Sequence, residues 1–79
     1  MLIEVFGPGC MKCNASADCA REFLTARGLE GEVVKVTDLE TMTARGVFRT
    51  PAVFIDGEKV LEGRKLREKD LAAWFENRA

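Results

Sequence analysis

The sequence predicts an α/β fold with a four-stranded mixed sheet flanked by three helices, in the order β-α-β-α-β-β-α. Three observations support this prediction. Short apolar runs alternate with amphipathic segments, turns with glycine or proline separate them, and Asp56-Gly57 joins two of the runs as a type I′ hairpin signal. With 79 residues, the chain has the length of a single domain, residues 1–79.

The first half of the chain predicts two strands connected by a helix. Residues 2–6 contain β-branched and aromatic side chains and end at Gly7-Pro8-Gly9, which predicts a strand. Residues 13–27 gather apolar side chains on one helical face before Gly28, a suitable helix stop. Residues 32–36 predict a second strand, which should be parallel to the first because a right-handed helical crossover connects the two.

A short helix is expected after the second strand. Thr37 and Glu40 have the spacing of a capping box, so Thr37 should cap this helix. The helix should end at Arg45, directly before Gly46.

The last third of the chain predicts a hairpin and a final helix. Residues 52–55 and 58–61 are apolar-rich runs on either side of the hairpin turn, so they should pair antiparallel. Residues 67–77 predict an amphipathic helix that packs on the sheet. Its apolar face is formed by Leu71, Trp74 and Phe75.

The composition excludes several kinds of function. A formal net charge of −1 gives no broad attraction to nucleic acids or anionic membranes. The absence of histidine excludes Cys-His nucleophilic pairs, histidine general bases and zinc sites that need imidazole. Three cysteines are too few for a disulfide scaffold. The class of function that remains is cysteine chemistry that works without histidine.

The first residues lack the pattern of a targeting segment. Glu4 interrupts the apolar run, and no lysine or arginine precedes it. No stretch approaches the roughly 20 apolar residues of a membrane span. We therefore expect a cytoplasmic protein, whose thiols are kept reduced.

A pair of cysteines, Cys10-Met11-Lys12-Cys13, stands between the first predicted strand and the first predicted helix. Unpaired N–H groups and the positive dipole end at a helix start stabilise a thiolate, so the pKa of Cys10 should lie below about 8.5. Lys12 adds a cation nearby. Cys13 should be more buried and able to attack a mixed disulfide formed by Cys10. The pair predicts redox chemistry, with metal binding or a structural disulfide as alternatives.

The third cysteine, Cys19, follows Cys13 by six residues, a helical rise of about 9 Å. Bridged Cα atoms approach within about 7 Å, so the two cannot form a disulfide in an intact helix. We interpret Cys19 as a small hydrophobic residue of the core.

Thr50-Pro51 directly precedes the third predicted strand. Together with the cysteine pair and with Gly63 after the last strand, it makes the chain resemble the thioredoxin/glutaredoxin superfamily in its most compact form, that of thioredoxin-like redox-active disulfide proteins. The resemblance covers essentially the whole chain and implies a thioredoxin-like fold.

The resemblance also implies an activity, that of a thiol–disulfide oxidoreductase acting as protein-disulfide reductase and electron carrier. Cys10 would attack a substrate disulfide and Cys13 would resolve the mixed disulfide, with no cofactor besides this redox-active pair. The Thr50–Pro51 bond would be cis and would stand against the pair, with the Thr50 backbone bound to an incoming substrate strand. Gly63 would leave room for that partner.

The implied partners are protein disulfide substrates, with Phe48 and Arg49 at the rim of the docking surface, and a reductant. Glutaredoxins carry an acidic glutathione-binding motif after the last strand, where this chain has the basic segment Glu62-Gly63-Arg64-Lys65. We therefore expect a thioredoxin-reductase-like flavoenzyme as reductant rather than glutathione. The expected protein is a monomer without nucleic-acid or membrane partners.

Glu4 precedes Cys10 by six residues, which matches the offset of the buried carboxylate that relays protons in thioredoxins. A buried carboxyl could accept the proton of Cys13 during resolution. The alternative is a partly solvated glutamate with no catalytic role.

Two other functions stay open at this point. Heavy-metal-associated domains also place a C-x-x-C motif after a first strand, so the pair could bind a soft metal. Those domains end in a strand and favour methionine where this chain has Pro8, which argues against them. A regulatory module whose cysteines sense oxidation is the other possibility.

Overall fold

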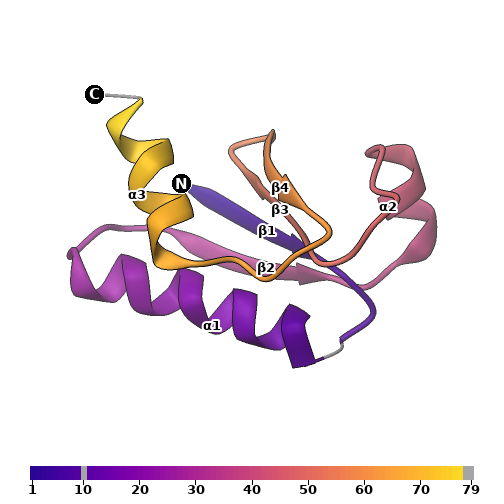
Figure 1. The fold of residues 1–79 in the computed structure, drawn as a ribbon, viewed down its shortest axis with the longest axis horizontal. Coiled ribbons are helices and arrows are strands. Elements are labelled where there is room, and N and C mark those ends of the chain that lie inside the picture. The colour runs from indigo at the N-terminus through magenta and orange to yellow at the C-terminus, as the bar shows by residue number, and fades with distance from the viewer. Residues whose placement is uncertain (10, 78–79) are drawn as a thin grey trace.

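The computed structural model describes residues 1–9 and 11–77, so Cys10 and residues 78–79 lie outside the described part of the chain. The predicted α/β fold, with four strands and three helices in the expected order, is confirmed (Figure 1). The elements are β1 (Leu2–Phe6), α1 (Met11–Ala26), β2 (Glu32–Val36), α2 (Leu39–Ala44), β3 (Ala52–Ile55), β4 (Glu58–Glu62) and α3 (Glu68–Glu76).

The four strands form one mixed sheet in the order β2-β1-β3-β4. β1 is parallel to β2 and antiparallel to β3, and β3 is antiparallel to β4. Asp56 and Gly57 have φ angles of 50° and 86° at the β3–β4 turn, as a type I′ turn requires. β1 and β3 are central, and all four residues of β3 are buried.

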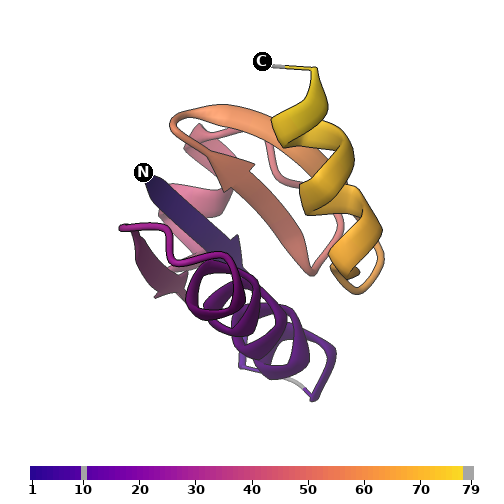
Figure 2. The ribbon, with the colours of Figure 1, turned by 90° about the vertical axis from the view of Figure 1, so that its left-hand side faces the viewer.

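The sheet is covered on both faces (Figure 2). Ile3 and Val5 point to the face on which α1 and α3 pack, and they join the larger hydrophobic cluster with Leu24 and Leu71. Phe6 points to the opposite face, where a smaller cluster includes Met42 of α2. This division follows from the alternation of side chains along a strand. No helix within the described residues is long and apolar enough to cross a membrane.

The topology brings three connecting segments to one edge of the sheet. Phe6 at the end of β1 lies opposite Ala52 at the start of β3, and Ala52 lies opposite Glu62 at the end of β4. The residues that follow β1, precede β3 and follow β4 therefore meet at this edge.

The helix starts differ from the predicted ones. The cap of α2 is Asp38 rather than Thr37, because the Asp38 carboxylate reaches the Thr41 N–H at 2.9 Å. Hydrogen bonds from the Thr41 hydroxyl and backbone N–H lower the pKa of Asp38. α1 begins at Met11 instead of residue 13.

The last helix, α3, has no serine, threonine or asparagine cap. The Asp70 carboxylate instead accepts a hydrogen bond from the Arg67 N–H at 2.9 Å, directly before the first helical residue. An acidic side chain in the first turn also interacts favourably with the helix dipole. The start of α3 is thus stabilised from inside the helix.

Replacing the cap of α2 tests the corrected boundary. Asp38→Ala should lower the unfolding temperature measurably, because it removes the acceptor for the Thr41 N–H. Thr37→Ala is the matched control and should have a smaller effect. Thermal unfolding followed by circular dichroism measures both, and a larger loss in Thr37→Ala would contradict the assignment.

Candidate redox site

The sulfur of Cys13 is buried at the start of α1, with the residue only 2% exposed. It packs directly on the backbone of Gly7: a Cβ at Gly7 would overlap Cys13 Sγ and lie 3.6 Å from Thr50 Cβ. Gly7, Cys13 and Thr50 therefore meet at the sheet edge described above. The sequence indicated Gly7 only as part of a turn, since a glycine that gives room to a sulfur has no pattern of its own.

Thr50 and Pro51 are joined by a cis peptide bond. Pro51 is fully buried, and its carbonyl accepts a hydrogen bond from the Gly63 N–H at 2.9 Å. The structure thus brings together four of the residues singled out from the sequence: Cys13, Thr50, Pro51 and Gly63. Cys10, the proposed attacking cysteine, lies outside the described residues.

Gly63 is needed for its backbone conformation, with a φ of 86° that side chains rarely adopt. The predicted open space beside Gly63 is partly occupied by Arg49. A Cβ at Gly63 would lie 3.1 Å from Arg49 Cδ and 3.3 Å from Arg49 Cβ. The aliphatic stem of Arg49 therefore lies across Gly63.

Glu62 holds the segment that precedes Thr50. Its Oε2 accepts hydrogen bonds from the backbone N–H groups of Phe48 at 2.6 Å and Arg49 at 3.0 Å, and Lys59 Nζ donates to Oε1 at 2.9 Å. The Lys59 hydrogen bond and the two N–H groups lower the pKa of Glu62 to about 2. The sequence prediction missed this role, because a glutamate at a strand end gives no sign of its backbone partners.

Ser16 ties the first turn of α1 to the segment after β4. It is fully buried, and its Oγ donates to the Lys12 carbonyl at 2.8 Å and accepts from the Leu66 N–H at 3.0 Å. No local pattern in the sequence marks this serine, because its partner Leu66 lies 50 residues away.

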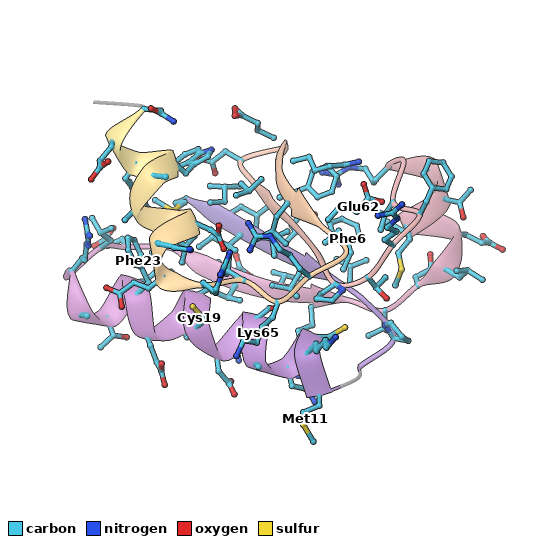
Figure 3. The ribbon with its side chains drawn as sticks, in the orientation of Figure 1. Phe6, Met11, Cys19, Phe23, Glu62 and Lys65 are labelled. Atoms are coloured by element: carbon cyan, nitrogen blue, oxygen red, sulfur yellow. The ribbon has the colours of Figure 1, made fainter. Side chains whose placement is uncertain are left out.

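The surface around the site carries exposed apolar and cationic groups. Met11 is 86% exposed and points away from the sheet (Figure 3), and Phe48 is 83% exposed. Lys12, inside the cysteine motif, is also exposed. Large apolar side chains held in water beside a reactive group are typical of a docking surface.

Glu4 forms an ion pair with Arg45, directly after α2. It shares the α2 face of the sheet with Phe6, and its carboxylate accepts two hydrogen bonds from Arg45, at 3.1 and 3.3 Å. The Arg45 guanidinium also lies 4.7 Å from the centre of the Phe54 ring. Glu4 is thus mostly buried and ion-paired on the face of the sheet that α2 covers.

Cys19 is half-buried rather than a full member of the core. It packs against the larger cluster from the side of α1 that faces α3, beside Phe23 (Figure 3). Burial, together with the negative charge of Glu22, raises the pKa of its thiol. A raised pKa disfavours the thiolate, which makes Cys19 a poor nucleophile.

A comparison of the chain with models of known protein families gives a match over nearly its whole length. The family model described as a thioredoxin domain matches residues 1–76. The chain belongs to the thioredoxin-domain family. The order of its elements, which ends in helix α3, also leaves the soft-metal alternative without support.

Known thioredoxins resemble this thioredoxin-domain chain over most of its length. A thioredoxin of Methanocaldococcus jannaschii is 39% identical over 64 residues, 81% of this chain and 73% of the relative. A thioredoxin of Methanothermobacter thermautotrophicus is 27% identical over 71 residues, 90% of this chain and 92% of the relative. The structure of thioredoxin 1 from Thermosipho africanus superposes with a TM-score of 0.62 at 20% identity, covering 99% and 98% of the two chains, which confirms the fold.

Removing the Ser16 hydroxyl tests how strongly the site depends on it. Ser16→Ala should lower the free energy of unfolding by about 1–3 kcal/mol, because it leaves the Leu66 N–H buried without its acceptor. Thr43→Ala is the matched control: Thr43 makes the same type of bond to the carbonyl four residues earlier, but on an exposed surface. Chemical denaturation measures both, and equal losses would contradict the buried-acceptor argument.

Proposed function

We propose that this thioredoxin-like redox protein is a protein-disulfide reductase that works through Cys10 and Cys13. The observation that carries the proposal is the packing of the Cys13 sulfur on the Gly7 backbone, on the same side of Gly7 as Thr50, which is joined to Pro51 by a cis peptide bond. Membership of the thioredoxin-domain family and the thioredoxin relatives support it.

The proposed reaction has two thiol–disulfide exchanges. The Cys10 thiolate attacks one sulfur of the substrate disulfide, forming a mixed disulfide and releasing the first substrate thiolate, which takes up a proton. Cys13 then loses its proton and attacks Cys10 Sγ, which forms the Cys10–Cys13 disulfide and releases the second substrate thiol. Two electrons pass from the cysteine pair to the substrate.

The surroundings explain how the pair works without histidine. Cys10 directly precedes α1, whose N–H groups and dipole favour a thiolate, and Lys12 adds positive charge. Cys13 is buried, and burial in an apolar environment disfavours the thiolate. The two cysteines are thus suited to successive roles, the first as attacker and the second as resolver.

Regeneration of the reduced cysteine pair requires two electrons. We propose a thioredoxin-reductase-like flavoenzyme as the source, acting on the Cys10–Cys13 disulfide in the cytoplasm, where reduced thiols are maintained. The reductase would hold the flavin, and this chain would act as a monomer whose redox group is the cysteine pair alone.

Trapping the mixed disulfide tests the assignment of roles. Cys13→Ser should accumulate mixed disulfides with a protein substrate such as insulin, because resolution is lost while attack by Cys10 continues. Cys10→Ser should abolish both trapping and insulin reduction with dithiothreitol as reductant. Cys19→Ser is the control and should keep wild-type turnover.

Two results, one from trapping and one from turnover, would contradict the proposal. Mass spectrometry of the trapped species would overturn the role assignment if the substrate were joined through Cys13 or Cys19. A wild-type protein that forms the internal disulfide but shows no sustained turnover would instead be a sensing module.

The role of Glu4 as proton acceptor for Cys13 is a second, separate proposal. Glu4→Gln should slow resolution severalfold at neutral pH, and less at high pH, where Cys13 ionises without a base. Arg45→Gln is the control, because it breaks the same ion pair but keeps the carboxylate. Equal resolution rates in wild type and Glu4→Gln, measured by stopped flow, would leave Glu4 a structural role only.

A further inference from the structure

Arg49 differs from the other arginines of the described chain. Within residues 1–9 and 11–77, it is the one arginine whose guanidinium has neither a carboxylate nor an aromatic ring beside it. The others are engaged as follows: Arg21 with Asp18, Arg27 over Phe23, Arg45 with Glu4, and Arg64 and Arg67 with Asp70. The positive charge of Arg49 is therefore available to a partner molecule.

The carboxylate that holds the Arg49 main chain is already occupied. Glu62 binds the backbone N–H groups of Phe48 and Arg49 and the ammonium group of Lys59. These bonds favour the ionised carboxylate and lower the pKa of Glu62 to about 2. Glu62 thus fixes the Arg49 main chain without neutralising the Arg49 side chain.

The position of Arg49 is also defined relative to the redox site. Its aliphatic stem lies across Gly63, and the Gly63 N–H donates to the carbonyl of Pro51. Thr50, which joins Arg49 to Pro51, contacts the same side of Gly7 as the Cys13 sulfur. A substrate that docks beside Thr50 therefore lies next to Arg49, the neighbour of Thr50 in the chain.

We propose that Arg49 selects protein partners that carry a carboxylate next to their disulfide, and that Glu62 is the positioning residue that presents Arg49 for this contact. The proposal rests on the proposed function and names the class of partner on which the site acts. The attraction is local, because the whole chain has a net charge of −1. Lys12, exposed on the α1 side, adds a second cation near the same partner.

The test compares two synthetic peptides with the same cystine loop, one flanked by glutamates and the other by lysines. The measured quantity is the ratio of kcat/KM for the acidic peptide to that for the basic peptide. Each value is divided by the rate of the same variant with a small uncharged disulfide, so that changes in folding or in cysteine chemistry cancel. Wild type should prefer the acidic peptide, and Arg49→Gln should lower the ratio roughly threefold or more, the scale of an exposed charge contact.

Three variants separate a local contact from other effects. Arg49→Lys should keep most of the preference. Glu62→Gln should weaken it through KM rather than kcat, because the charge of Arg49 remains but its main chain is held less firmly. Arg27→Gln makes the same change of net charge at the distant end of α1 and should leave the ratio unchanged.

Several results would overturn the inference. The proposed contact would be contradicted by a wild-type ratio near one or by an unchanged ratio in Arg49→Gln. An equal drop of the ratio in Arg27→Gln would contradict it as well. A preference that survives high salt would exclude a charge effect, because salt screens exposed charges. Failure of wild type to reduce the small uncharged disulfide would instead contradict the proposed function itself.

Discussion

The contact between the Cys13 sulfur and the Gly7 backbone is the constraint on which the rest of the site depends. α1 approaches the sheet edge closely only because Gly7 has no side chain at the position where Cys13 Sγ lies. Protein interiors are packed so tightly that even one added methyl group is felt. Thr50 lies on the same side of Gly7 as the sulfur, and the cis bond to Pro51 and the hydrogen bond from Gly63 to Pro51 join the other two residues to it. The site is therefore built from backbone proximity more than from polar side chains.

The two faces of the sheet serve separate purposes. The face under α1 and α3 holds the larger cluster and the buried Cys13, and the hydroxyl of Ser16 is its polar link. The face under α2 holds the ion pair of Glu4 and Arg45, stacked on aromatic rings. The separation follows from the alternation of side chains along β1, in which Glu4 and Phe6 share one direction and Ile3 and Val5 the other.

The sequence was sufficient to predict the features that depend on local patterns. Strand and helix order, the parallel and antiparallel pairings and the hairpin at Asp56-Gly57 follow from periodicity and turn chemistry, and the structure has them. The capping-box spacing predicts the cap of α2 one residue too early, because Thr37 and Asp38 are both good caps and only the geometry decides between them. The contacts of Ser16, Glu62 and Arg49 were beyond prediction, since each joins segments far apart in the chain through the backbone of its partner.

The bond between Ser16 and Leu66 has a consequence for synthesis of the chain. A ribosome completes the cysteine motif well before it reaches Leu66, 50 residues after Ser16. During that interval Ser16 Oγ has no Leu66 N–H to accept from, so the link between α1 and the segment after β4 forms only when most of the chain has been made. Domains fold once their interacting parts have been made. The hydrogen bond that ties α1 to the segment after β4 is therefore a late event in the folding of a newly made chain.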